Sequence, residues 1–200
     1  MADFVHLTNK TEYSLSEGAL PIARIAELCQ SFSMPAVGIS DNNNMFGALE
    51  FSEQIAKVGV QPILGCNIKI KTPKEYLHEN IEDNDLYFYL NIFSKNNEGY
   101  ENLLKCVSNA YTFNKGNAYV TVDDLIKFKD GLIILSGGNN SILAHSTDHM
   151  ITKQSQQFVS DFKREFNDNF YIEIQRFGSC LLYTSDAADD SLRVDLGGRR

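Results

Sequence analysis

Short apolar runs, in which successive rather than alternate residues are hydrophobic, constrain the fold of this 200-residue chain more than any other feature. The sequences "AVGIS" at Ala36–Ser40 and "LIILS" at Leu132–Ser136 are typical of these runs. A strand that is covered on both faces reads as a continuous apolar run, whereas a half-exposed strand alternates. The runs therefore predict parallel strands that are buried between helices. Six segments are predicted to be strands: Phe4–Leu7, Ala36–Ser40, Pro62–Ile70, Leu86–Ser94, Leu132–Ser136 and Phe170–Gln175.

Segments with the i, i+3, i+4, i+7 spacing of one buried helix face lie between the predicted strands. Four helices are predicted from this spacing: Leu20–Phe32, Gly47–Val58, Glu98–Ala110 and Thr152–Phe166. Gly59 follows the second helix as its C′ residue, and Thr152 is the N-cap of the fourth. Asp123 and Asp124 indicate the start of a further helix, where negative charge is favourable by about 0.3–1 kcal/mol. Strands that alternate with helices predict an α/β fold of right-handed βαβ units, either a barrel or an open sheet.

The composition is that of an ordinary globular protein, with 43% hydrophobic and 22% charged residues. A formal net charge of −8 argues against nucleic-acid binding by this segment itself, because phosphate binding needs clustered Lys and Arg. No apolar run approaches the ~18–20 residues that span a bilayer. The N-terminus also has no signal-peptide pattern, so we expect a cytoplasmic location. Cys29, Cys66 and Cys106 form no CxxC pair and are expected to be buried, reduced thiols.

The last 21 residues, "CLLYTSDAADDSLRVDLGGRR", break the alternation of strands and helices. They closely resemble a transposon-type sequencing adapter translated in one frame. We therefore expect Cys180–Arg200 to be a disordered, non-native tail. Residues 1–179 are then predicted to form a single domain that is truncated at its C-terminal end.

Three segments together resemble a known family, with a fourth in support: "FVHLTNKTEYSLSEGAL" at Phe4–Leu20, "MPAVGISDNNNMFGALEFSEQIAKVGVQPILGCNI" at Met34–Ile68, "GLIILSGG" at Gly131–Gly138, and "FYIEIQRFG" at Phe170–Gly178. The resemblance is to the PHP (polymerase and histidinol phosphatase) domain at the N-terminus of bacterial DNA polymerase III alpha subunits. The second segment is the most specific of the four. The resemblance implies a distorted (β/α)7-type barrel, of which about six strands are present in this chain.

Some members of this family carry a metal-dependent phosphoesterase centre at the strand ends, and the resemblance places its ligand positions in this sequence. The first strand of those members ends in His-x-His, the second in Thr-Asp-His-Gly, and the third carries Gly-Cys-Glu. The corresponding positions here are His6, Thr8, Lys10, Asp41, Asn42 and Asn67.

The residue types at these positions predict a dismantled metal site. A hydrolytic metal cluster needs imidazole and carboxylate ligands that neutralise its charge. Lys10 is a cation with no free lone pair at neutral pH, and Thr8, Asn42 and Asn67 are weak neutral ligands. His6 and Asp41 are the remnant ligands, and no catalytic residue is predicted. A relaxed metal site of His6, Asp41 and His145 or His149 is the alternative.

Other polar residues give weaker signals. His145 and His149 lie four residues apart, as in helical zinc motifs, but lack the glutamate of HExxH and are interpreted as surface residues. His78 lies in a hydrophilic connection and is expected to be solvated. Ser136 has no His–Asp arrangement nearby, so a nucleophile is not supported. The Gly-Gly pair that begins at Gly137 is interpreted as a turn rather than as a phosphate site.

The resemblance implies that the parent protein is the catalytic subunit of the bacterial replicative DNA polymerase. This segment would be a non-catalytic scaffold and the docking site for the proofreading exonuclease subunit and other replicase subunits. We expect no cofactor in this segment, magnesium in the polymerase domain that it lacks, DNA contact only through missing domains, and no membrane. The alternative is a free-standing metal-dependent phosphoesterase of the histidinol-phosphatase kind, and a simple binding module is a third possibility.

Overall fold

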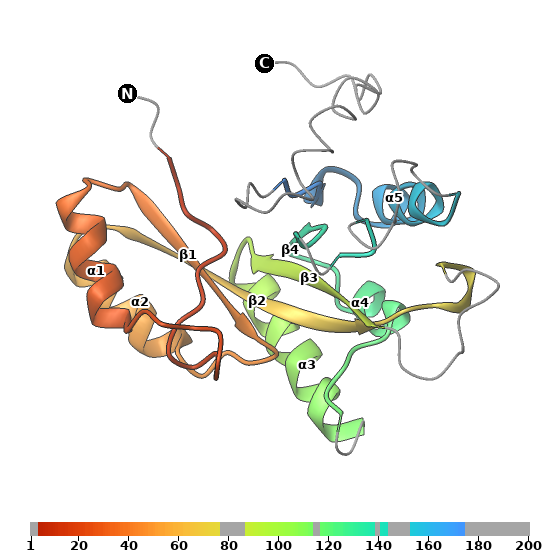
Figure 1. The fold of residues 1–200 in the computed structure, drawn as a ribbon, viewed down its shortest axis with the longest axis horizontal. Helices are drawn as coiled ribbons and strands as arrows, with labels where there is room; N and C mark the ends of the chain where they lie inside the picture. Colours follow the sequence, from red (N-terminus) through yellow and green to blue (C-terminus); the bar gives the residue numbers. More distant parts are fainter. Residues whose placement is uncertain (1–3, 77–86, 114–116, 139–140, 144–152, 175–200) are drawn as a thin grey trace.

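Each strand of the sheet pairs with the strand that precedes it in the chain, in the order β1-β2-β3-β4-β5. The structure is a computed structural model that describes residues 4–76, 87–113, 117–138, 141–143 and 153–174 (Figure 1). The sheet is not closed into a barrel over these residues, as the predicted incomplete barrel requires. None of the helices in these ranges is long and apolar enough to cross a membrane. Several predicted features lie outside the described residues: His78, His145, His149, Thr152 and Cys180–Arg200.

The helices and strands follow the predicted alternation of apolar runs and amphipathic segments. The strands are β1 (Ala36–Asn42), β2 (Gln61–Lys71), β3 (Tyr87–Ser94), β4 (Leu132–Leu135) and β5 (Phe170–Tyr171). The α-helices are α1 (Ile22–Ser31), α2 (Ala48–Lys57), α3 (Asn97–Phe113), α4 (Val122–Lys127) and α5 (Lys153–Phe166). Short 3-10 turns lie at Lys74–Tyr76 and Asn167–Asn169.

The direction of the strands differs from the prediction of a parallel sheet. Strand β1 is parallel to β2 and β4 is parallel to β5, but β3 runs antiparallel to both β2 and β4. In β3, half-buried Tyr87 and Tyr89 alternate with fully buried Phe88 and Leu90. Such alternation is typical of antiparallel strands. The prediction of parallel strands is therefore confirmed for the pairs β1–β2 and β4–β5 and wrong for β3.

The predicted first strand, Phe4–Leu7, is an extended segment beside β1 rather than a strand of the sheet. The backbone N–H of Gly38 donates to the carbonyl of His6 at 2.8 Å, and that of Ser40 donates to the carbonyl of Asn9 at 2.8 Å. A Cβ on Gly38 would lie 2.5 Å from the carbonyl oxygen of Leu7, so glycine permits this close approach. Residues 6–9 therefore lie along the outer edge of β1.

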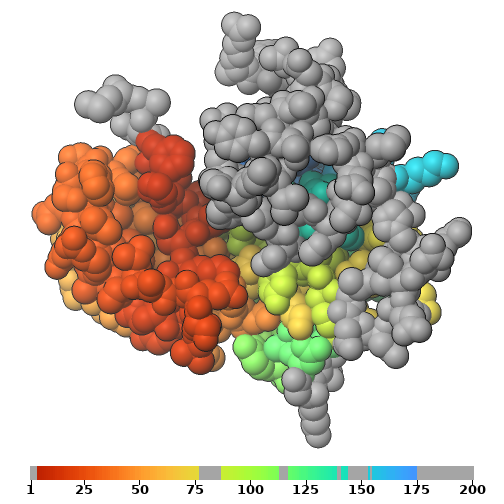
Figure 2. Space-filling model, in the orientation of Figure 1, coloured from red at the N-terminus to blue at the C-terminus, as the bar shows by residue number. Residues whose placement is uncertain are grey.

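Two hydrophobic cores stabilise the sheet. The smaller core joins α1 and α2 to β1 and includes Ile22, Ile39 and Phe51, each at most 2% exposed. The larger core joins β2–β5 to α3 and α5. In Figure 2 the N-terminal residues, coloured red to orange, gather on one side of the molecule, in agreement with a core of their own. Cys29, Cys66 and Cys106 are buried free thiols, as predicted, and burial raises the pKa of Cys106 to about 12.

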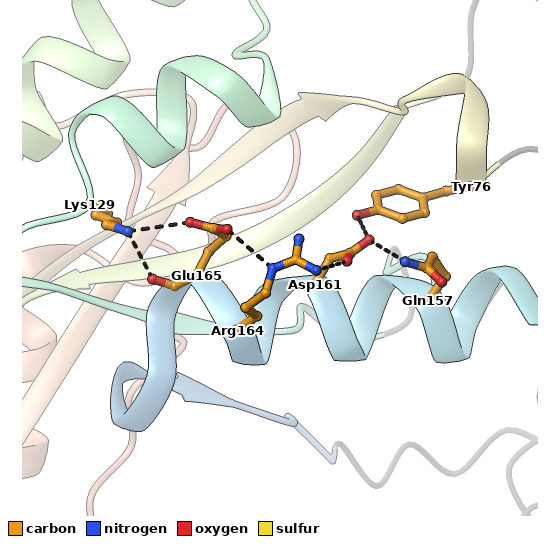
Figure 3. A network of polar contacts seen from close by, with 6 residues as sticks. All are labelled: Tyr76, Lys129, Gln157, Asp161, Arg164 and Glu165. Carbon is orange, nitrogen blue, oxygen red and sulfur yellow. Dashed lines mark hydrogen bonds and ion pairs between the residues drawn. The ribbon is translucent and has the colours of Figure 1, made fainter.

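Helix α5 is attached by an aromatic face and by a chain of polar contacts. Its aromatic face of Phe158, Phe162 and Phe166 is at most 4% exposed. Its polar contacts are shown in Figure 3, in which the carboxylate of Asp161 accepts hydrogen bonds from Tyr76 at 3.0 Å and Gln157 at 2.9 Å. The chain continues through two ion pairs of Arg164, to Asp161 and Glu165, and a pair of Glu165 with Lys129. These contacts join α5 to Tyr76, which follows β2, and to Lys129, which follows α4.

Candidate functional site

The register of the sheet brings the predicted strand-end positions together. Asp41 lies opposite Cys66, and Asn42 lies opposite Asn67. Asn67 in turn lies opposite Asn91 of β3. Residues that are opposite in register point to the same face of a sheet, and their neighbours along the strand point to the other face. Asn42, Asn67 and Asn91 therefore form a row of amides, named here the amide row, and Asp41 faces away from it.

Asp41, one of the two predicted remnant ligands, is 1% exposed and has both carboxylate oxygens occupied. The backbone N–H of Thr11 donates to Oδ1 at 2.7 Å and the Thr11 hydroxyl donates to Oδ2 at 2.8 Å. The Ser14 hydroxyl donates to Oδ1 at 2.5 Å. The same hydroxyl oxygen accepts the N–H of Asn42 at 3.1 Å. Asp41 therefore anchors the loop after the first extended segment to the end of β1.

Thr11 and Ser14 are residues that the sequence analysis missed. Both are fully buried although they lie in a loop. The signal that could have found them is chemical, because a carboxylate at the end of a buried strand requires donors. Thr11 and Ser14, two hydroxyl residues three positions apart in the loop before α1, are the nearest source of such donors.

His6, the other remnant ligand, lies in a different environment. Its side chain is exposed, and its ring packs edge-on against Phe4 with ring centroids 4.7 Å apart. Its carbonyl, rather than its imidazole, connects it to β1. Thr8 is half-buried on the same extended segment. The structure therefore gives His6 and Asp41 different neighbours.

Lys10 lies where the metal-binding members of the resembling family have a ligand, and here it forms an ion pair with Glu17. The side chains are 29% and 54% exposed, respectively. Hydrogen bonds from the Lys10 ammonium and then from the Asn42 side chain lower the pKa of the Glu17 carboxyl. Glu17 is a further residue that the sequence did not assign to the site. The ammonium of Lys10 thus has a carboxylate partner within its own loop.

The amide row ends on a carboxylate. The Asn67 side-chain N–H donates to Asn91 Oδ1 at 2.7 Å, and the Asn91 side-chain N–H donates to Glu173 Oε2 at 2.7 Å. Asn67 is 8% exposed and Asn91 is 4% exposed. The Ser136 hydroxyl accepts the N–H of Glu173 at 3.0 Å. Asn91 and Glu173 were not predicted, and Ser136 has a structural contact.

The predicted ligand positions do not fit a metal cluster. Among the described residues, no group of three or more His, Cys, Asp or Glu side chains could hold a metal ion. Within the same ranges, Ser40 Oγ and Asn42 Oδ1 are buried oxygens without a hydrogen-bond partner. Both are neutral and cannot offset the charge of a divalent cation. The described residues at these positions bind loops and strands to one another.

Two further sequence interpretations are confirmed by local geometry. Gly137 has a φ of +76°, and a Cβ there would lie 2.0 Å from the carbonyl oxygen of Tyr89, so the pair begins a tight turn. Thr121 caps α4, since its hydroxyl accepts the N–H of Asp124 at 3.1 Å. Asp124 therefore belongs to a helix start, as predicted.

Comparisons with known proteins agree with the resemblance seen in the sequence. The family model described as the PHP domain matches residues 6–177. Three relatives named DNA polymerase III subunit alpha, from Haemophilus influenzae, Rickettsia felis and Caulobacter vibrioides, are 30%, 33% and 34% identical to this chain. The matches cover 87–88% of this chain but only 14–15% of the length of each relative.

Two solved structures share the fold at low sequence identity. A protein from Bifidobacterium adolescentis, provisionally described as a metal-dependent phosphoesterase, aligns with a TM-score of 0.56 and 11% identity over 94% of this chain and 85% of its own. An amidohydrolase from Chromobacterium violaceum aligns with a TM-score of 0.52 and 9% identity over 83% of this chain and 75% of its own. At such identities the likeness extends to the fold alone.

Proposed function

The chain belongs to the PHP domain family, and we propose that it forms the N-terminal PHP domain of a bacterial DNA polymerase III alpha subunit, without phosphoesterase activity of its own. The relatives that share this name support the first part of the proposal. The second part rests on one observation, the hydrogen bonds of Thr11 and Ser14 to both oxygens of the buried Asp41 carboxylate.

Hydrolysis of a phosphate ester by a metal cluster needs a bound water of lowered pKa and cationic stabilisation of the leaving oxygen. Here residues at the corresponding positions bond to other residues of the chain instead. Lys10 pairs with Glu17, and Asn67 bonds to Asn91. A cation at Lys10 would also repel a metal ion. These contacts support a domain in which the residues at the strand ends stabilise the fold and do not catalyse a reaction.

In the proposed role the domain is a scaffold that docks the proofreading exonuclease subunit and other subunits of the replicase. DNA contact and the magnesium ions of polymerisation belong to parts of the parent protein outside this chain. The net charge of −8 supports this division, since an acidic segment is a poor site for the DNA backbone.

Metal analysis together with a phosphatase assay tests the absence of catalysis. The purified 200-residue protein is dialysed against zinc and manganese, its bound metal is measured by mass spectrometry, and turnover of p-nitrophenyl phosphate is followed. We expect neither bound metal in proportion to protein nor turnover, and no change of Tm on addition of EDTA. A metal-binding phosphoesterase of the same family serves as the positive control. Stoichiometric metal with turnover that EDTA abolishes would support the free-standing phosphoesterase instead.

A further inference from the structure

The sheet face that carries the amide row continues into lysines and tyrosines. Lys69 and Lys71 follow Asn67 at alternate positions of β2, so their side chains lie on the same face as that of Asn67. In the register with β3, Lys69 lies opposite Tyr89 and Lys71 lies opposite Tyr87. Amides, ammonium groups and phenol rings therefore line one face of β2 and β3.

The opposite face of these two strands belongs to the larger hydrophobic core. Four side chains that alternate with the polar ones are each at most 1% exposed: Ile68, Ile70, Phe88 and Leu90. By contrast, Lys69 and Tyr87 are half-buried, and Lys71 is exposed. The polar face is therefore the one that a dissolved ligand can reach.

The two ammonium groups lie against aromatic rings and an amide. The Lys69 ammonium lies 4.0 Å from the centroid of the Tyr87 ring and donates to Asn117 Oδ1 at 2.8 Å. The Asn117 side-chain N–H donates to the Tyr87 hydroxyl at 2.9 Å. The Lys71 ammonium lies 5.7 Å from the centroid of the Tyr119 ring, which is 5.4 Å from that of Tyr87. We name Lys69, Lys71, Tyr87, Asn117 and Tyr119 the lysine–tyrosine cluster.

The positive charge of the lysine–tyrosine cluster is not neutralised by a carboxylate. Over the described ranges, no Asp or Glu forms an ion pair with Lys69 or Lys71. Ring faces and an amide oxygen attract a cation but carry no net charge. The two carboxylates that bond to the amide row have partners there, because Glu17 pairs with Lys10 and Glu173 accepts from an amide of the row. A half-buried ammonium without a counter-ion is costly, so a bound anion would stabilise the cluster.

The chemistry of the lysine–tyrosine cluster suits a phosphate group. An ammonium has three donors, of which Lys69 gives one to Asn117. Lysine binds phosphate as a point charge. Alternate residues of a strand are about 7 Å apart, so the long side chains of Lys69 and Lys71 can both reach one phosphate group. The formal net charge of −8 disfavours a long nucleic acid, which indicates a ligand with few phosphates.

We propose that the lysine–tyrosine cluster binds the phosphate group of a small molecule. Such binding goes beyond the proposed function and is independent of it, since it involves neither catalysis nor partner subunits. It needs no metal ion, because the two ammonium groups supply the positive charge. The phosphate is either inorganic or part of an ester such as a nucleoside monophosphate, and the experiment below distinguishes these two sources.

NMR titration of the 15N-labelled 200-residue chain tests the site. Inorganic phosphate, deoxyadenosine monophosphate and deoxyadenosine are added separately at constant ionic strength, and the amide signals of β2 and of residues 117–120 are followed. Lys69→Gln and Lys71→Gln remove one charge each, whereas Lys71→Arg retains it. Lys95→Gln is the matched control, because Lys95 is exposed just beyond β3, at the end away from Tyr87. Circular dichroism and Tm establish that each variant is folded.

We expect saturable shifts with inorganic phosphate and with the monophosphate, and none with deoxyadenosine. Each Gln variant should weaken binding by about tenfold, as the loss of a hydrogen bond to a charged group does. Lys71→Arg and Lys95→Gln should stay within about twofold of the wild type. If Lys69→Gln does not fold, Lys71→Gln decides, since it changes an exposed side chain.

The remaining outcomes either assign the source of the phosphate or reject the site. Shifts with the monophosphate alone, weakened in the Gln variants, would support the site and assign it to a phosphate ester. Absence of binding by both phosphates would overturn the proposal, as would equal affinity in the wild type and the Gln variants. Equal weakening in Lys95→Gln would show diffuse attraction by surface charge and would also overturn it. In each of these cases the proposed function is unaffected.

Discussion

Thr11 binds both carboxylate oxygens of Asp41, through its backbone N–H at 2.7 Å and its hydroxyl at 2.8 Å. The two residues are 30 positions apart in the chain, and both are buried. A carboxylate that holds a loop in this way needs no cation to compensate its burial, because the donors supply the favourable electrostatics. The loop, in turn, places Tyr13 against the start of α2 and leaves Leu15 exposed on the surface.

Removal of the Asp41 carboxylate should destabilise the domain strongly. Hydrogen bonds to charged groups contribute about 1.5–3 kcal/mol each, and Asp41→Ala leaves buried donors of Thr11 and Ser14 without an acceptor. We expect the free energy of unfolding in urea to fall by about 3 kcal/mol or more. His6→Ala is the control and should stay within about 0.5 kcal/mol, since the His6 side chain is exposed. Equal stabilities of the two variants would contradict the anchoring role of Asp41.

Gly38→Ala should release the N-terminal segment from β1. The new Cβ would lie 2.5 Å from the carbonyl oxygen of Leu7, a backbone atom that cannot move without loss of the contacts to His6 and Asn9. We expect a loss of about 1–3 kcal/mol, as overpacking typically costs. Hydrogen exchange at the amides of Gly38 and Ser40 should also become faster in the folded protein. Ala23→Ser, on the exposed side of α1, should change neither quantity; slow exchange retained in Gly38→Ala would show that the segment tolerates the methyl group.

Asn91→Ala should loosen the end of the described sheet. Asn91 donates to Glu173 and accepts from Asn67, so its truncation leaves a buried amide and a carboxylate without these partners. A cost of about 1–3 kcal/mol is expected. Amides near β5 should exchange faster, whereas Ser108→Ala on the exposed side of α3 should leave exchange unchanged. Wild-type protection of β5 in the Asn91 variant would mean that the amide row does not hold this strand.

Tyr76→Phe should remove one hydrogen bond to Asp161 while the ring keeps its edge-on contact with Phe158. We expect a loss of about 0.5–1.5 kcal/mol at neutral pH. Hydrogen bonds from Gln157 and Tyr76, with the charge of Arg164, lower the pKa of Asp161, so its contribution is present above about pH 4 and is lost as the pH falls further. The difference between variant and wild type should therefore narrow in acid.

The same substitution has a signature in alkali. Burial, followed by the hydrogen bond to Asp161, raises the pKa of Tyr76. The folded state therefore holds this proton more tightly than the unfolded state, and the resulting stability is present below about pH 10 and is lost as the pH rises. Urea titrations at several pH values should show a smaller alkaline loss for Tyr76→Phe. An unchanged alkaline slope would assign that loss to other groups.

The sequence predicted the elements better than their contacts. The segments now seen as α1, α2, α3 and α5 were predicted to within a few residues, because each carries one strongly apolar face. The predicted direction of β3 was wrong because the prediction followed the successive apolar runs of other strands. The alternation of Tyr87 and Tyr89 with their buried neighbours was given less weight. Direction depends on which strand a segment meets, and a local pattern holds little information about that.

At the candidate site, too, residue types could be interpreted from the sequence and contacts could not. The weak ligand chemistry of Lys10, Asn42 and Asn67 could be read from residue type alone. Their partners could not, because Glu17 and Asn91 are brought to them by a loop and by the register between strands. A shift of one residue in that register would turn Asn91 to the other face of the sheet. Contacts of this kind become visible only in three dimensions.

The order β1-β2-β3-β4-β5 also bears on how the domain is made. Since each strand pairs with the one before it, a chain leaving the ribosome meets its pairing partner as soon as the next strand emerges. Loops between neighbouring strands are short compared with those of folds in which the first and last strands must meet, so less chain entropy is lost before pairing begins. The sheet can thus grow in the direction of translation, and the part already formed shields its apolar strands from neighbouring chains while synthesis continues.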